Sequence, residues 1–197
     1  MKVIAISGVA RSGKDTFCNY ALEFLAQKKI TAQRKSFADA IKRDVGPLCL
    51  QKIGINPYTT NTEEKSIIRP LLVAYGTDIM RKLDEDWWIE RLDEDLEVCR
   101  ELNITPIITD VRYPNEITWL KEKLNGVLVH VTKYGTKPPN KEEKINNPIL
   151  KDSADYKIRW HAHGDDEIIK CRKPVRAIMR KIHKDYLSNP HETRQHH

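Results

Sequence analysis

Residues 8–16 of the chain are Gly8-Val9-Ala10-Arg11-Ser12-Gly13-Lys14-Asp15-Thr16, and they follow an apolar run at residues 3–6. The pattern G-x-x-x-x-G-K between a strand and a helix is typical of a loop whose backbone N–H groups surround nucleotide phosphates. Lys14 would reach the phosphate oxygens, and the N-terminus of the following helix would add positive potential. The alternative is a glycine turn in an ordinary strand–helix unit. The flanking segments favour the phosphate loop, so we predict that all nine residues bind a nucleotide.

One position departs from the common form of this loop. Asp15 stands where a serine or threonine normally offers its hydroxyl to magnesium. Either Thr16 supplies that hydroxyl instead, or Asp15 contacts the metal through a water molecule. Both residues are therefore candidate metal ligands, and Mg²⁺ is the expected cofactor.

Length and composition narrow the class of protein. A chain of 197 residues suits one α/β domain with a small inserted subdomain. Its apolar runs are far shorter than the roughly 20 residues of a spanning helix, and its first residues predict a strand rather than a signal peptide. We therefore expect no membrane association. The four cysteines include no C-x-x-C pair, which fits a reducing cytoplasm, that of a host cell if the gene is viral.

The basic character of the chain has two explanations. A formal net charge of +6 suits either nucleic acid or a pocket for polyanionic nucleotides. Much of the excess lies at residues 170–184, where Val175, Ile178, Met179 and Ile182 recur at helical spacing. This spacing predicts a helix with a solvated basic face, and no DNA-reading motif accompanies it. We expect that no nucleic acid is required, while a non-catalytic nucleotide-binding or DNA-binding protein stays an alternative.

Strand-like and helix-like segments alternate along the chain, which predicts a three-layer α/β fold with a parallel sheet flanked by helices. The expected strands are residues 2–7, 32–37, 105–110, 126–132 and 155–159. The expected helices are residues 14–28, 38–44, 63–83, 86–102, 115–124 and a final helix from about residue 165. We expect one domain at residues 1–187 with an insertion at about 38–104, then a polar tail at 188–197. Residues 133–152 form either a functional lid or a flexible linker.

Asp110 ends an apolar strand, which matches the Walker B arrangement of a carboxylate that holds magnesium directly or through water. The carboxyl ends of parallel strands meet at one edge of a sheet, so Asp110 is expected beside the phosphate loop. The alternative is a turn residue or a cap for the next helix. Arg112 follows two residues later and could stabilise charge on a phosphoryl group in transfer. An isolated surface arginine would have the same appearance in the sequence.

Four segments in order resemble those of bacteriophage-type deoxynucleoside monophosphate kinases and, more distantly, of animal phosphomevalonate kinases. They are residues 7–16 (SGVARSGKDT), 36–42 (SFADAIK), 75–81 (YGTDIMR) and 109–116 (TDVRYPNE). The similarity extends from residue 1 to about residue 185. The phosphate loop alone indicates only nucleotide binding, whereas the other elements indicate the family.

The resemblance implies a P-loop kinase that transfers the γ-phosphate of ATP to a deoxynucleoside 5′-monophosphate, with Mg²⁺. Monomer and homodimer both stay open, and so does a different small phosphorylated metabolite as acceptor. Lys14, Asp110 and Arg112 would be catalytic, and Asp15, Thr16 and Asp110 would serve the metal. The lid region carries lysines but no arginine, so Arg11 would supply the guanidinium expected there.

The resemblance also implies an acceptor site between the second strand and the strand that bears the aspartate. Its expected residues are Phe37, Lys42, Tyr75, Asp78, Arg81 and Trp88. Lys42 and Arg81 would hold the acceptor's phosphate, and one of the aromatic side chains, Trp87 included, would stack on its base. For the two tryptophans, packing in the core is the alternative.

Overall fold

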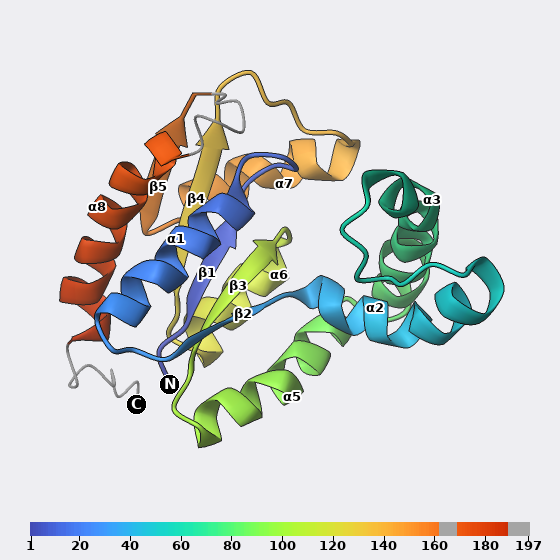
Figure 1. Cartoon of the computed structure of the whole chain (residues 1–197), viewed down its shortest axis with the longest axis horizontal. Helices are drawn as coiled ribbons and strands as arrows, with labels where there is room; N and C mark the ends of the chain where they lie inside the picture. The colour runs from blue at the N-terminus through green and yellow to red at the C-terminus, as the bar shows by residue number, and fades with distance from the viewer. Residues whose placement is uncertain (162–168, 189–197) are drawn as a thin grey trace.

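The computed structural model of the protein describes residues 1–161 and 169–188. Five parallel strands form one sheet in the order β2-β3-β1-β4-β5 (Figure 1). The strands are β1 (Ile4–Ser7), β2 (Ala32–Lys35), β3 (Thr105–Val111), β4 (Val127–Lys133) and β5 (Tyr156–Trp160). The predicted parallel α/β sheet is confirmed, with β1, the strand that leads into the phosphate loop, at its centre.

Helices cover both faces of this sheet. They are α1 (Lys14–Gln27), α2 (Phe37–Leu48), α3 (Thr62–Val73), α4 (Arg81–Leu83), α5 (Trp87–Glu101), α6 (Pro114–Thr118), α7 (Lys141–Asp152) and α8 (Arg172–Ile182). Single π-helical segments continue some of them, namely η1 (Cys49–Ile53), η2 (Ala74–Met80), η3 (Trp119–Lys123) and η5 (His183–Leu187). Because η2 joins α3 to α4, the helix expected at residues 63–83 is one nearly continuous rod.

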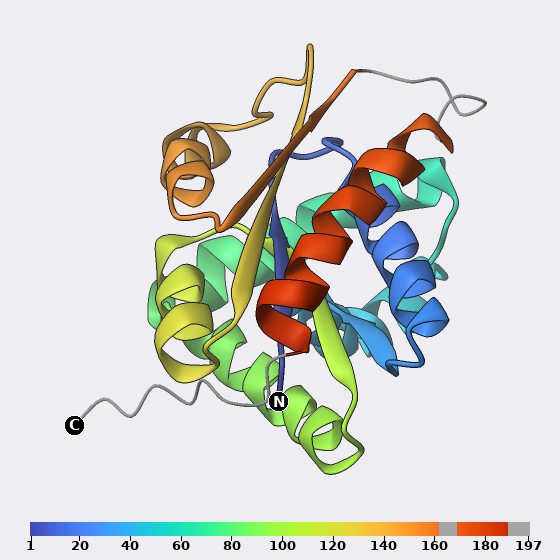
Figure 2. The same ribbon diagram turned by 90° about the vertical axis from the view of Figure 1, so that its left-hand side faces the viewer.

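The sheet separates two hydrophobic cores, as the alternation of side chains along a strand requires. Ile4 and Ile6 of β1 face α1 and α8, whereas Val3 and Ala5 face α5 and η3. Figure 2 shows α1 and α8 side by side on one face, with α5 and α6 on the opposite side of the strands. This arrangement is the three-layer fold predicted from the sequence.

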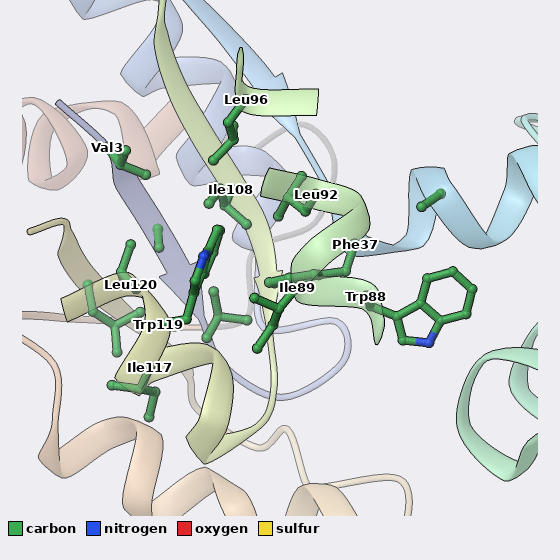
Figure 3. Packing of buried hydrophobic residues seen from close by; sticks show 14 of the residues in the cluster. Val3, Phe37, Trp88, Ile89, Leu92, Leu96, Ile108, Ile117, Trp119 and Leu120 are labelled. Carbon is green, nitrogen blue, oxygen red and sulfur yellow. The ribbon is translucent and has the colours of Figure 1, made fainter. Parts of the chain in front are cut away.

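The second core reaches the edge of the functional region. Figure 3 shows Ile108 of β3 close to Leu92 and Leu96 of α5, with Trp119 of η3 beside them. The Trp88 ring is directed away from these strands, and its Nε1–H donates to the carbonyl oxygen of Gly76 in η2 at 2.8 Å. The helices α2, α3 and α4, hereafter the arm, stand beside the sheet, and this bond attaches the arm to α5.

The ends of three predicted segments can be compared with the structure. The second strand ends at Lys35 rather than at residue 37, because Ser36 caps α2 and its Oγ accepts the N–H of Ala38 at 3.1 Å. The expected start of the last helix near residue 165 lies outside the described residues, and within them this helix is described from Arg172. Most of the tail expected at 188–197 also lies outside them.

In the described part of the chain, no helix is long and apolar enough to cross a membrane.

Residues 133–152 contain a helix of twelve residues, α7. Its N-terminus is set by Asn140, whose Oδ1 accepts the N–H of Glu143 at 2.8 Å. Leu150 is the one residue of α7 that is fully buried against the rest of the protein. The segment is therefore neither a long loop nor a linker without regular structure.

Candidate functional site

A cleft of about 440 Å³ lies where β1 and β3 end, between the phosphate loop, the arm and α7. Ligands of open α/β sheets bind at this edge, beyond the carboxyl ends of the strands. The charged residues in its walls include Arg11, Lys14, Asp15, Arg69, Arg81, Asp110, Arg112, Glu116 and Glu143. The cleft therefore brings Ala10, Arg11, Lys14 and Asp15 of the phosphate loop together with the candidate site residues Asp110, Arg112 and Arg81.

The backbone of the phosphate loop lies so close to neighbouring residues that a side chain would not fit at Gly8 or Gly13. Gly8 has φ +139°, and a Cβ there would lie 2.3 Å from the carbonyl oxygen of Val131. Gly13 has φ +93°, and a Cβ there would lie 2.6 Å from the ring of Trp160. Trp160 Nε1–H also donates to the carbonyl oxygen of Ser12 at 2.9 Å. Trp160, which ends β5, therefore holds the loop in place, a role that no local sequence pattern indicates.

Lys14 begins α1, and its side chain turns back along the loop. Its Nζ donates to the carbonyl oxygens of Gly8 at 2.8 Å and of Val9 at 2.9 Å. Burial lowers the pKa of the Lys14 ammonium to about 8, and the neighbouring positive charge of Arg112 acts in the same direction. The amine is still mainly protonated at pH 7, so it offers a positive charge to the cleft.

Asp15 and Thr16, the two candidate metal ligands of the loop, differ in position. Asp15 is exposed in the first turn of α1 and lines the cleft. Thr16 is half-buried and is not among the residues of the cleft walls. Of the two side chains, only that of Asp15 faces the cleft.

Asp110 caps a helix as well as lining the cleft. One carboxylate oxygen accepts the N–H of Phe37 at 3.0 Å, and the other accepts the Ser36 hydroxyl at 2.7 Å and the N–H of Ala38 at 3.0 Å. These donors form the N-terminus of α2, where a negative charge is also favoured by the helix dipole. The sequence-based alternative of a cap for the next helix along the chain is thus wrong, because Asp110 caps α2, which precedes it in the sequence, and it also lines the cleft.

Arg81 and Arg112 are linked through a single buried carboxylate. Arg81 donates to Glu116 at 2.7 Å, and its guanidinium lies 3.8 Å from the centroid of the Tyr113 ring. The other oxygen of Glu116 accepts the backbone N–H groups of Arg112 at 2.7 Å and of Tyr113 at 3.1 Å. Burial raises the pKa of Glu116 to about 7, and the charge of Arg81 opposes this rise.

Helix α7 contacts the phosphate loop through Glu143, whose side chain is only 10% exposed. One of its oxygens accepts the backbone N–H of Ala10 at 2.8 Å, and the other pairs with the Arg112 guanidinium at 3.1 Å. Asn146, one turn further along α7, donates to the carbonyl oxygen of Arg112 at 3.1 Å. A carboxylate of α7 therefore occupies an amide donor of the phosphate loop.

A second cavity of about 690 Å³ adjoins the other side of the loop. Arg11 lines both cavities, and Lys133, Tyr134 and Lys137 of the segment before α7 line only the second. Its walls thus combine positive charge, including that of Arg69 from α3, with one aromatic ring.

The expected acceptor residues divide into two groups. Phe37, Arg81 and Trp88 line the cleft, although the two aromatic side chains are almost fully buried in the core. Three others do not line it, because their contacts lie elsewhere: Lys42 is 5.2 Å from the Tyr58 ring centroid, Tyr75 donates to Asp44 and Asp78 pairs with Lys82. Trp87 is half-buried against the core and is also absent from the cleft walls.

Five charged residues of the cleft walls were not predicted from the sequence, namely Arg34, Arg69, Glu116, Glu142 and Glu143. Arg69 lies on α3 and lines both cavities. Glu116 was visible only as the last residue of the segment at 109–116, and Glu143 only as one of several charges in a polar stretch. Their importance follows from contacts with residues of other elements.

Comparisons with known proteins indicate the family and the fold of the chain. Residues 27–151 match the family model described as "Deoxynucleotide monophosphate kinase", a span that excludes the phosphate loop. The fold is similar to that of a dephospho-CoA kinase from Campylobacter jejuni, with a TM-score of 0.51 at 12% identity, covering 92% of this chain and 99% of that one. A gluconokinase from Sinorhizobium meliloti 1021 aligns with a TM-score of 0.46 at 11% identity over 96% and 98% of the two chains. No individual curated protein sequence matches the chain.

The family match covers more than half of the chain and includes Asp110, Arg112, Arg81 and the whole of the arm. The phosphate loop lies outside that match, and its sequence pattern is the one typical of the nucleotide-binding loop of such an enzyme. The chain therefore belongs to the deoxynucleotide monophosphate kinase family and is an ATP-dependent nucleotide kinase.

Proposed function

We propose that the protein transfers the γ-phosphate of ATP to a deoxynucleoside 5′-monophosphate and releases the diphosphate. One observation carries the proposal: a single cleft has the phosphate loop on one wall and Arg81 of the arm on another, with Arg112 between them. Phosphoryl transfer requires little covalent chemistry from the protein, so it depends on positioning and on positive charge around the moving group. The cleft offers both.

On the donor side, the loop amides and Lys14 would bind the phosphates of ATP, with Arg112 stabilising the charge that spreads over the transferring group. Arg11 and Tyr134 support a place for the rest of the donor in the second cavity. Arg11 would add the guanidinium that the segment at 133–152 lacks.

On the acceptor side, Arg81 would hold the phosphate of the monophosphate. The apolar part of the wall beside it includes Phe37, Ile41, Leu72 and Trp88, which suits the face or edge of a nucleobase. Because Phe37 and Trp88 expose little surface, we propose edge contact with the base rather than full stacking.

Magnesium fits the residues at this site. Asp15 and Asp110 both line the cleft with carboxylate oxygens, the ligand type that Mg²⁺ prefers, and one or two protein carboxylates plus substrate phosphates suffice for it. Both oxygens of Asp110 already accept hydrogen bonds from α2, so we propose that Asp110 acts through a water molecule. When bound, the metal would neutralise charge on the phosphates.

The two loop candidates for the metal can be separated by mutation. Since Asp15 faces the cleft and Thr16 does not, we expect Asp15→Asn to raise the Mg²⁺ concentration needed for half-maximal rate severalfold, and Thr16→Val to change it less. Magnesium titrations at fixed ATP measure both effects. The reverse order would make the Thr16 hydroxyl the ligand, and no change in either variant would remove both side chains from the metal site.

We propose further that α7 is the lid of this kinase. Glu143 accepts the N–H of Ala10, a donor that the phosphates of a nucleotide would also use, and it pairs with Arg112. A nucleotide and Glu143 therefore compete for the same donors, so α7 must shift when ATP binds.

This competition predicts that Glu143→Gln binds ATP more tightly, by about threefold to tenfold, because a neutral amide competes less well for Ala10 and Arg112. Calorimetric titration with Mg·ATP and no acceptor measures the change. Glu142→Gln is the matched control, since the neighbouring Glu142 contacts the Tyr113 hydroxyl and not the loop. Unchanged or weaker ATP binding in Glu143→Gln would contradict the competition.

The proposed reaction is tested by ADP formation with a panel of deoxynucleoside and ribonucleoside monophosphates. We expect ADP release to depend on at least one deoxynucleoside monophosphate. ADP release without any acceptor would indicate an ATPase, and none under any condition would indicate a non-catalytic nucleotide-binding protein.

All four cysteines are buried free thiols, which supports the cytoplasm as the place of action.

A further inference from the structure

Glu116 is the most completely buried charged residue of the cleft, with 1% of its surface exposed. It lies on the short helix α6, which follows soon after β3, the strand that carries Asp110 and ends at Val111. Its two carboxylate oxygens serve different partners. Oε1 accepts the Arg81 guanidinium at 2.7 Å, and Oε2 accepts the backbone N–H groups of Arg112 at 2.7 Å and Tyr113 at 3.1 Å.

Capping of α6 explains only half of these contacts. A cap needs the bond from Glu116 to the N–H of Tyr113, and a neutral glutamine makes that bond as well as a glutamate does. The bond to Arg81 has no capping role, and a buried ion pair is weak evidence for stability because both charges lose their water. The charge of Glu116 therefore needs a different explanation from the cap.

The position of Arg81 provides that explanation. Its side chain is only 11% exposed, Glu116 meets the edge of its guanidinium, and the Tyr113 ring covers one face at 3.8 Å. A further N–H donates to the carbonyl oxygen of Glu85 at 3.2 Å. With these contacts the guanidinium has one orientation, and part of its set of five N–H donors stays available to a ligand in the cleft.

We propose that Glu116 is a positioning residue that fixes the Arg81 guanidinium and the backbone of Arg112 relative to each other across the cleft. The inference rests on the proposed function, in which Arg81 holds the acceptor and Arg112 acts on the transferring group. Because phosphoryl transfer needs the attacking and leaving oxygens in line, a displacement of about 1 Å between these two arginines can cost on the order of a hundredfold in rate. One rigid carboxylate that holds both prevents that displacement.

Glu116→Gln tests this role, because it keeps the size and the cap but removes the charge. The partners on both sides of residue 116, Arg81 on one side and the N–H groups of Arg112 and Tyr113 on the other, are all hydrogen-bond donors. A glutamine has only one side-chain oxygen, so its NH₂ group must face a donor on one of the two sides. We expect acceptor KM to rise and kcat to fall, each about tenfold or more, with ATP affinity unchanged. Glu122→Gln, the same change at an exposed position of η3, is the matched control.

A double-mutant cycle with Arg81→Ala separates positioning from a purely structural role. If Glu116 acts on the acceptor through Arg81, Glu116→Gln raises acceptor KM in the wild-type background and not in the Arg81→Ala background. Its effect on kcat should also shrink in the Arg81→Ala background, because the glutamine oxygen can then face the N–H groups of Arg112 and Tyr113 without a competing donor on the other side. Fully additive effects on KM would overturn the inference.

The pH profile gives a readout that loss of stability alone would not produce. Glu116 faces the charges of Arg81 of α4 and Asp110 at the end of β3, and it accepts hydrogen bonds from the backbone N–H groups of Arg112 and Tyr113. With a pKa of about 7, Glu116 is ionised and pairs fully with Arg81 only above that pH. Wild-type kcat/KM for the acceptor should therefore rise through pH 7 more steeply than that of Glu116→Gln, which retains only the titration of the acceptor's own phosphate.

The outcomes distinguish this inference from the proposed function. A wild-type protein inactive with every monophosphate overturns both, whereas an active wild type with a folded, kinetically normal Glu116→Gln overturns only the role of Glu116. Thermal melting shows whether the variant is folded. If it is not, Glu116→Asp, which keeps the charge and shortens the reach, decides the question: unchanged acceptor KM and kcat would contradict the positioning role.

Discussion

Lys14→Ala is expected to lower kcat by at least about a hundredfold while the protein stays folded. The Lys14 ammonium contacts only loop carbonyl oxygens and belongs to neither hydrophobic core, so its removal costs the fold little. The loss is expected in the transition state, because Lys14 is proposed to bind the donor phosphates. Coupled ADP formation at saturating substrates measures the effect, and circular dichroism checks the fold.

The pH dependence provides a second readout of Lys14. Because burial lowers its pKa to about 8, its charge in the free enzyme is lost as the pH rises through that value. Wild-type kcat/KM for ATP should therefore fall above about pH 8, and Lys14→Ala should lack this limb. Lys28→Ala, at an exposed position at the other end of α1, is the control. Near-normal turnover in a folded Lys14→Ala protein would rule out the phosphate loop as the donor site.

The second large effect concerns Arg112 and Arg81, whose removal is expected to change different kinetic constants. Arg112→Ala should lower kcat by about a hundredfold with little change in acceptor KM, because Arg112 is proposed to act on the group in transfer. Arg81→Ala should raise acceptor KM by about tenfold to a hundredfold and change kcat less, since it removes a charged bond made in ground and transition states alike. Steady-state kinetics at saturating ATP, with acceptor varied, measures both.

Arg100 provides a matched control for these two arginine variants. Arg100 lies on α5, pairs with Asp93 and Glu97 and does not line the cleft, so Arg100→Ala should leave both constants unchanged. An unchanged acceptor KM in Arg81→Ala would place the acceptor phosphate elsewhere in the cleft. An unchanged kcat in Arg112→Ala would leave Lys14 and Arg11 as the cations at the transferring group.

The layers of the fold were predictable because they depend on local patterns. The apolar runs that became β1, β3 and β4 are short and bounded by turn residues, and the loop at residues 8–16 determines that a helix follows the first strand. Helix α7 escaped prediction because it buries only Leu150 and contains Pro148, so it lacks the apolar periodicity of a packed helix. Its clearest local signal is the cap at Asn140.

The candidate site was predictable where one motif carries the chemistry, and not where partners come from distant elements. Lys14 and Asp110 follow from their place after strands. Glu143, by contrast, meets Ala10 across 133 positions of sequence, and no local pattern records such a contact. Lys42 and Tyr75 were assigned by segment alone, and the rotation of their helices directs them away from the cleft.

The most direct test of the central claim follows the γ-phosphate itself. ATP labelled at the γ-position is incubated with Mg²⁺, the protein and each deoxynucleoside 5′-monophosphate in turn, and the products are separated by chromatography. We predict that the label appears in a deoxynucleoside diphosphate with at least one of them, and that Lys14→Ala abolishes this product. Label found only in inorganic phosphate, or only in ATP, would contradict the account.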